Sequence, residues 1–62
     1  MLISAEQIKQ LYSMLQEYPT TDYVHIRSGI GDSDFADYYE QKPLFNKPKL
    51  LGTIEITDVG AL

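Results

Sequence analysis

The sequence predicts an α+β fold in which one N-terminal helix packs on a three-stranded antiparallel sheet, in the order α-β-β-β. Three patterns support this class: a capped segment with helical periodicity at residues 5–17, and two segments, at residues 23–29 and 50–59, in which apolar and polar residues alternate. An aromatic segment between the alternating ones, residues 34–40, supplies the middle strand. Because the 62 residues contain no repeat and no low-complexity tract, we expect a single small domain spanning residues 1–62.

The predicted helix begins at Ala5. The Ser4 side chain can accept a hydrogen bond from the Gln7 amide while the Gln7 side chain reaches back to the cap, and Ile3 can pack on Ile8. A capping box and a hydrophobic staple therefore coincide at the same helix start.

The predicted helix ends at Glu17, because Pro19 disfavours a helical conformation of the residue before it. Within the helix, apolar residues recur at the spacing of a one-sided helix, at Ile8, Leu11, Tyr12 and Leu15. Met14 and Tyr18 flank this stripe. We interpret the stripe and its flanking residues as part of the core, since their spacing is what packing against a sheet requires.

The first and last strands each present one apolar face. Val24 and Ile26 point to one side of the first strand, and Ile54 and Ile56 point to one side of the last. Residues 41–48 contain two prolines and an asparagine, which is typical of a connecting loop. The helix stripe is expected to cover the apolar face of these strands.

The register of the middle strand stays open at this level. Either Phe35 and Tyr39 point inward, which places Asp37 between them, or Ala36 and Tyr38 point inward, which leaves two large aromatic side chains facing water. A short helix over residues 33–39 is a competing interpretation of the same segment.

The composition excludes several function classes. A net charge of −4 and an isoelectric point near 4.6 argue against direct nucleic-acid binding, which needs a Lys/Arg patch. No apolar run approaches the roughly 20 residues that span a bilayer, and the N-terminus has no basic segment ahead of an apolar one. The absence of cysteine fits a reducing compartment. We therefore expect a cytoplasmic protein that is bound neither to a membrane nor to nucleic acid.

The most distinctive segment, residues 29–40, carries three aspartates and a glutamate without a basic residue. A calcium loop of the EF-hand type fails on spacing: Asp32 and Asp34 fit its first and third positions, but Ala36 and Asp37 stand where an acid and a glycine are needed. We expect no metal site.

A phosphate cradle also fails, because Gly29 and Gly31 are typical of a chain reversal and the third glycine of a GxGxxG fingerprint is missing. His25 is the only histidine, and it stands in an alternating strand beside aromatic and basic neighbours. A chain this short has little volume to enclose a substrate and desolvate a carboxylate. We expect no cofactor and no enzymatic activity.

Protein binding is the function class that these exclusions leave. Four acids within nine residues are interleaved with aromatic side chains, a composition that protein interfaces favour. The alternative is a solvated strand and turn whose charges keep an exposed sheet soluble. The candidate surface for a basic protein partner consists of Asp32, Asp34, Asp37 and Glu40, with Tyr38 or Tyr39 as an aromatic anchor.

The order of elements, with Gly29-Ile30-Gly31 in the turn and Ile56-Thr57-Asp58 near the C-terminus, resembles that of short uncharacterised proteins encoded by phages and prophages, over roughly residues 23–58. The resemblance implies an accessory protein that binds a host or phage component, such as a host nucleic-acid-handling or defence complex, and inhibits it in the host cytoplasm. The leading hypothesis is a small acidic, non-enzymatic protein-binding module.

The alternative is a structural or assembly component that acts mainly through self-association. Because the core is small and no disulfide is available, we expect a homo-oligomer in either case.

Overall fold

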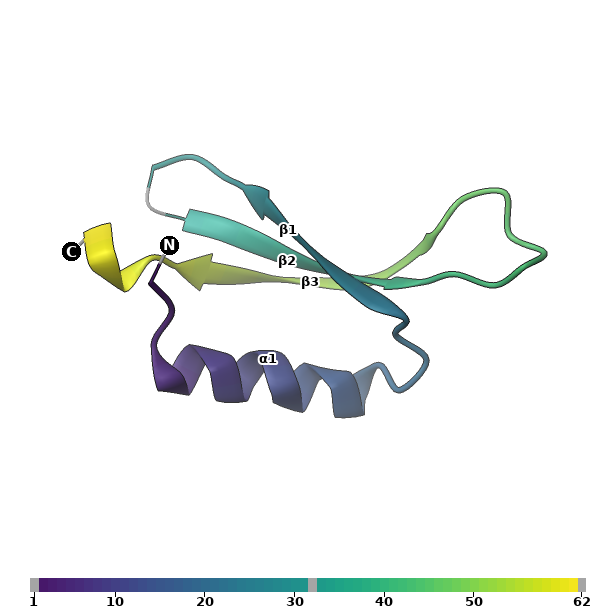
Figure 1. The fold of residues 1–62 in the computed structure, drawn as a ribbon, viewed down its shortest axis with the longest axis horizontal. Helices are drawn as coiled ribbons and strands as arrows, with labels where there is room; N and C mark the ends of the chain where they lie inside the picture. Colours follow the sequence, from purple (N-terminus) through teal and green to yellow (C-terminus); the bar gives the residue numbers. More distant parts are fainter. Residues whose placement is uncertain (1, 32, 62) are drawn as a thin grey trace.

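A computed structural model describes residues 2–31 and 33–61 of the chain. One helix precedes a three-stranded antiparallel sheet of order β1-β2-β3, and the helix lies along one face of that sheet (Figure 1). The predicted α+β class is therefore confirmed. The elements are α1 (Ala5–Glu17), β1 (Tyr23–Ser28), β2 (Ser33–Glu40), β3 (Lys49–Thr57) and the short 3-10 helix η1 (Val59–Ala61).

The start and end of α1 agree with the sequence, but its cap is simpler than expected. The Ser4 hydroxyl accepts a hydrogen bond from the Gln7 amide at 3.1 Å. The Gln7 side chain does not return to the cap; it donates to the Gln10 side-chain oxygen at 2.9 Å, one turn further along. The reciprocal half of the predicted capping box is therefore wrong, because Gln10 offers an acceptor on the same helix face.

The core is very small. Only Ala36, Tyr38 and Ile56 are fully buried apolar residues among those described, each with 0% of its surface exposed. The Tyr38 hydroxyl donates a hydrogen bond to the Leu11 carbonyl at 2.7 Å, which satisfies the polar end of this buried ring. Half-buried residues surround this centre: Ile3, Leu11, Met14, Tyr18, Val24, Leu51 and Ile54.

The middle strand resolves the question of register. Residues 33–40 form a continuous strand, so the competing helix is wrong, and Ala36 and Tyr38 are the pair that point towards α1. Ala36 lies opposite Ile26 on one side and Ile54 on the other. The inward face is thus apolar across all three strands.

The helix faces the sheet through only part of the predicted stripe. Ile8, Tyr12 and Leu15 remain 54%, 69% and 38% exposed, so the prediction that the stripe is buried is wrong for all three. The prediction is confirmed for Leu11 of the stripe and for the flanking Met14 and Tyr18, which contact the core together with Ile3 before the helix.

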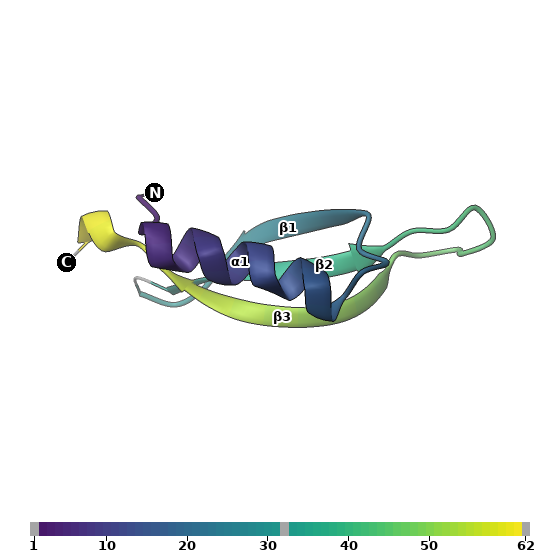
Figure 2. The ribbon, with the colours of Figure 1, turned by 90° about the horizontal axis from the view of Figure 1, so that it is seen from below.

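The reason for this rotation lies at the C-terminal end of α1. The Tyr18 side chain rests against Gly52 in β3, where an added Cβ would collide with it, and its ring lies 5.9 Å from the Tyr38 ring. Gly52 thus leaves the space that lets the helix dock towards β3. Figure 2 shows the helix crossing the sheet obliquely, with its C-terminal half over β3 and with β1 along the far edge.

Candidate functional site

The face of the sheet opposite α1, here called the outer face, is organised around a buried carboxylate. Asp37, at the middle of β2, has only 3% of its surface exposed. Its oxygens accept hydrogen bonds from Arg27 Nε at 2.7 Å and from the Thr53 hydroxyl at 2.8 Å, and His25 Nδ1 lies 3.8 Å away. Because these partners come from β1 and β3, Asp37 connects all three strands.

The protonation state of Asp37 follows from these contacts. Burial on its own would raise the pKa of the Asp37 carboxyl. The hydrogen bonds from Thr53 and Arg27 and the charges of Arg27 and His25 act in the opposite direction, and together they hold the pKa below its ordinary value of 3.8. The carboxylate is therefore charged at neutral pH, and its role is structural, because its oxygens are committed to these partners.

Two aromatic contacts flank the carboxylate on the outer face. The Arg27 guanidinium carbon lies 4.6 Å above the centre of the Phe35 ring, a cation–π contact. The Tyr23 and Tyr39 rings lie 5.5 Å apart at an interplanar angle of 30°. The two large aromatic side chains of β2 are thus placed towards solvent, as one of the two registers predicted, but each is partly shielded by a side chain of β1.

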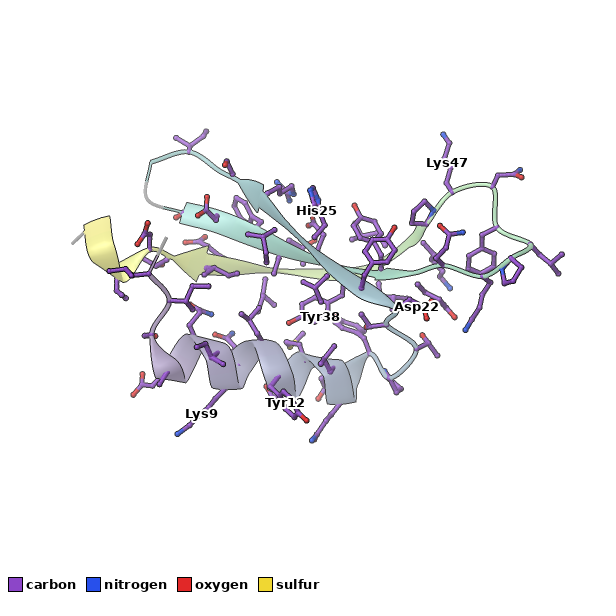
Figure 3. The ribbon with its side chains drawn as sticks, viewed as in Figure 1. Lys9, Tyr12, Asp22, His25, Tyr38 and Lys47 are labelled. Carbon is purple, nitrogen blue, oxygen red and sulfur yellow. The ribbon has the colours of Figure 1, made fainter. Side chains whose placement is uncertain are left out.

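A shallow hollow of ≈570 Å³ lies beside the tyrosine pair. In Figure 3, His25 projects away from α1 and Lys47 extends from the β2–β3 loop, whereas Tyr38 points to the helix. The hollow is lined by Tyr23, Val24, His25, Tyr39, Lys47 and Pro48. Aromatic surface, a hydrogen-bonding imidazole and a cation therefore meet in one place, a composition suited to contact with a protein surface.

The acidic surface expected from the sequence is not assembled among the described residues. Tyr38 is in the core and Asp37 is enclosed by its partners, so neither can meet a binding partner directly. Alternation along β2 places Asp34 and Glu40 on the helix side, opposite to the outer face that carries Tyr39. The period of two residues along a strand is the physical reason for this separation.

The remaining acids do not restore such a surface. Only 13% of the Glu40 side chain is exposed, and its carboxylate lies 3.7 Å from Lys42 Nζ. Asp34 is half-buried, and Asp32 lies outside the described residues. Of the five predicted site residues that the structure describes, Asp37 and Tyr39 lie on the outer face; Asp37 is enclosed and Tyr39 is partly exposed.

Sequence analysis missed Tyr23 and Arg27 as components of this face. Both belong to the first predicted strand, and its alternation already places their side chains on the face opposite Val24 and Ile26. Their pairing with Tyr39 and Asp37 depends on the register of the hairpin between β1 and β2, which alternation within one strand does not specify.

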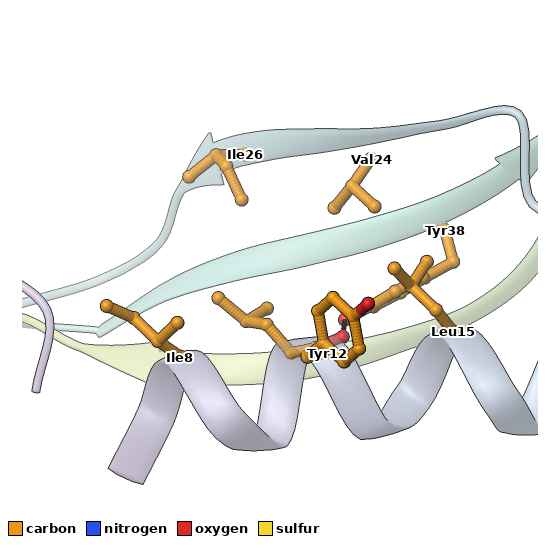
Figure 4. Close-up of a pocket in the computed structure, with 7 residues that line it drawn as sticks. Ile8, Tyr12, Leu15, Val24, Ile26 and Tyr38 are labelled. Atoms are coloured by element: carbon orange, nitrogen blue, oxygen red, sulfur yellow. Dashed lines mark hydrogen bonds between the residues drawn. The ribbon is translucent and has the colours of Figure 1, made fainter. Parts of the chain in front are cut away.

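The helix side of the sheet carries a second feature, an apolar groove between α1 and β1 with a volume of ≈310 Å³ (Figure 4). It occurs because α1 docks towards β3 and leaves the β1 part of the sheet uncovered. The groove is lined by Ile8, Leu11, Tyr12, Leu15, Val24, Ile26 and Tyr38. The predicted helix stripe is thus one wall of an open groove.

The described residues contain no group of three or more His, Cys, Asp or Glu side chains arranged to hold a metal ion. Over the same part of the chain, no helix has the length and apolar content needed to cross a bilayer. Comparison of the chain with protein-family models, with curated proteins and with solved structures found no match. The surfaces themselves therefore carry the functional argument.

Proposed function

We propose that this chain is a small acidic protein-binding module without catalytic activity, and that it contacts its partner through the outer face of the sheet around Tyr23 and Tyr39. The observation that supports this proposal is a pair of tyrosine rings in tilted contact on a sheet face that no helix covers among residues 2–31 and 33–61 (Figure 1). Tyrosine is enriched in the residues that dominate binding energy at interfaces.

The rigidity of the face supports the same proposal. Asp37 ties Arg27 to Thr53, and Arg27 in turn lies over the Phe35 ring. Side chains held in this way lose little conformational entropy when a partner binds. The tyrosine pair stands at one end of this network and is thereby presented on a preformed surface.

The charge of the chain supports a partner with a basic surface. A net charge of −4 attracts a basic protein over distances comparable to the Debye length and so raises the association rate. The resemblance to phage-encoded proteins supports a narrower form of the proposal, in which the partner is a host nucleic-acid-handling or defence complex that is inhibited by the binding. The chain would then act in the cytoplasm of the host cell.

The test is a capture experiment followed by kinetics. The immobilised chain is exposed to a host-cell lysate, and retained proteins are identified by mass spectrometry, with a Tyr39→Ala variant in parallel. A Tyr12→Ala variant is the matched control, because it removes the same side chain from the helix side. Tyr39→Ala should hasten release of the partner by about thirtyfold, as expected when an anchor worth about 2 kcal/mol is removed.

Salt dependence tests the nature of the partner. Binding to a basic surface should slow as ionic strength rises. Equal capture and equal release rates for Tyr39→Ala and the parent would contradict the proposed surface, and association that does not respond to salt would contradict a basic partner.

The second candidate function, an assembly component, is favoured by a different observation, the open groove between α1 and β1. Such a component would act through contacts between copies of the chain.

A further inference from the structure

The isolated chain is more open than a compact monomer of its size. Its accessible surface is 4552 Å², whereas a folded monomer of 7.1 kDa is expected to expose about 4,100 Å². Its radius of gyration is 12.7 Å, against about 10.6 Å for a compact domain of this length. The β2–β3 loop, residues 41–48, is exposed throughout and projects beyond the sheet, and it contributes to both differences (Figure 1). The small core leaves further apolar side chains exposed, among them Ile8, Tyr12 and Ile26.

The two edges of the sheet differ in how they are protected. The β2–β3 register shifts between Tyr38 and Tyr39 of β2, so that Leu51 of β3 has no residue opposite it. The exposed residues Lys49 and Glu55 of β3 flank this irregularity. Bulges and charges of this kind discourage pairing with another strand. The edge strand β1 contains no proline, no lysine, no acid and no register shift, and the charge of its arginine, Arg27, is paired with Asp37 of β2. It is therefore the less protected edge.

The open side of β1 can be assigned from the ladder. The Gly29 amide donates to the Ser33 carbonyl at 3.0 Å, directly beyond the last pair of the β1–β2 register. Backbone groups in an antiparallel strand point alternately to one side and the other. The amides and carbonyls of Val24, Ile26 and Ser28 consequently point outward, to the free edge.

The free edge and the apolar groove adjoin each other. Val24 and Ile26 supply the outward backbone groups, and their side chains also form the β1 side of the groove (Figure 4). Ile26 remains 46% exposed. A strand added at this edge would form hydrogen bonds with the outward amides and carbonyls of β1, and it would also extend the apolar floor of the groove.

We propose that a second copy of the chain pairs antiparallel along β1, so that two three-stranded sheets join into one six-stranded sheet with both helices on the same side. This inference does not rest on the proposed function, because the strand edge and the groove carry it whether or not a partner binds the outer face. The two grooves merge into one, with the side chains of Ile8, Tyr12 and Leu15 from each copy forming its walls.

The sequence of β1 specifies the register of this pairing. With the twofold axis at His25, Val24 of one copy lies opposite Ile26 of the other, and Tyr23 lies opposite Arg27. Apolar side chains then meet on the helix side, and an aromatic ring meets a guanidinium on the outer face. An axis at Ile26 would place His25 opposite Arg27, and a shift by one residue would exchange the two faces.

A second copy fits this surface better than a foreign helix does. The edge offers hydrogen-bonding groups that only a strand can use, and β1 is complementary to itself in the register described, as an isologous interface requires. A stable dimer buries roughly 800 Å² on each partner, a little under a fifth of the 4552 Å² that the chain exposes.

The first test is the molar mass of the intact chain by light scattering at micromolar concentrations. The expected mass is twice the 7.1 kDa of one chain. An Ile26→Lys variant places a charge in the merged groove and should reduce the mass to that of one chain. Ile30→Lys is the matched control, since Ile30 is almost fully exposed in the turn beyond β1, and it should remain dimeric.

The second test does not depend on the folding of Ile26→Lys. The described chain has no cysteine, so His25→Cys introduces a single thiol next to the proposed axis, at a pair of positions whose Cα separation suits a disulfide. Mild oxidation should yield a covalent dimer, whereas Glu55→Cys on the β3 edge should not. A 7.1 kDa mass for the parent chain, dimers of Ile26→Lys, or equal cross-linking of the two cysteine variants would each overturn the proposal.

Discussion

The two halves of the sheet have similar apolar sequences but very different environments. In the β2–β3 half, Tyr38 and Ile56 are fully buried beneath the helix. In the β1 half, Ile26 remains half-exposed beside an open groove. The difference shows that an alternating apolar pattern specifies which face of a strand turns inward, whereas the position of the covering helix decides how much of that face is buried.

The two halves also differ in what holds them. The β3 strand is held by its ladder with β2, by the hydrogen bond from Thr53 to Asp37 and, in addition, by the helix through the contact of Tyr18 with Gly52. The β1 strand is fixed to β2 by the ladder and by the polar contacts of Asp37 with Arg27 and His25. We therefore expect that β1 depends on outer-face electrostatics more than β3 does.

The largest expected change in the free energy of unfolding comes from comparing one apolar substitution in the β2–β3 half with one in the β1 half. Ile56→Ala should lower the free energy of unfolding by about 2–5 kcal/mol, because it opens a cavity in a core of three fully buried residues. Ile26→Ala should cost only about 1 kcal/mol in the monomer, since its side chain is half-exposed. Urea denaturation of both variants, at concentrations low enough to exclude association, measures the difference. Equal losses would mean that the β1 half is packed as tightly as the β2–β3 half.

A smaller effect is expected from Asp37→Asn. The change weakens charge-assisted hydrogen bonds and should cost about 1.5–3 kcal/mol. Because Arg27 and His25 belong to β1, hydrogen exchange should rise more in β1 than along β3. A uniform rise over the three strands would contradict the view that Asp37 is the main attachment of β1.

The pH dependence follows from the lowered pKa of Asp37. A carboxyl whose pKa is lower in the folded state contributes stability above its unfolded pKa and loses it as the pH falls through the folded value. The parent chain should therefore lose stability as the pH drops below about 3.9. The Asp37→Asn variant should lose less stability over the same pH range, because it has no carboxylate to protonate at this position. The melting temperatures of the two proteins should therefore converge at low pH. A constant difference across that range would argue against a charged Asp37.

The smallest change in the free energy of unfolding is expected at the N-cap of α1, the helix that covers the β2–β3 half of the sheet. Ser4→Ala should cost about 1 kcal/mol, because it removes the acceptor of the Gln7 amide. Gln7→Ala should leave the cap intact, since the Gln7 side chain bonds to Gln10. Thermal unfolding of the two variants compares them, and an equal loss in both would restore the full capping box that the sequence predicts.

The candidate site was predicted only in part. The sequence correctly identifies residues 29–40 as a turn followed by an aromatic, acidic segment, and Tyr39 lies in the candidate binding face. It could not distribute the acids over the two sides of the sheet, because that distribution depends on which of two registers the middle strand adopts. Once Ala36 and Tyr38 turn inward, Asp37 must point to the outer face and Asp34 to the helix side.

The sequence by itself determined the helix and the two alternating strands and their order, whereas it left the middle segment open between a strand and a short helix and did not predict η1. Local interactions are sufficient for this: a cap at Ser4, a proline after the helix, glycines in the turn and a period of two residues in the strands all act over a few positions. Tertiary structure alone decided how α1 is rotated on the sheet, because that depends on a glycine in β3 about 35 residues after Glu17 that makes room for a tyrosine ring. It also decided that the groove between α1 and β1 stays open, since the helix covers only the part of the sheet towards which it docks.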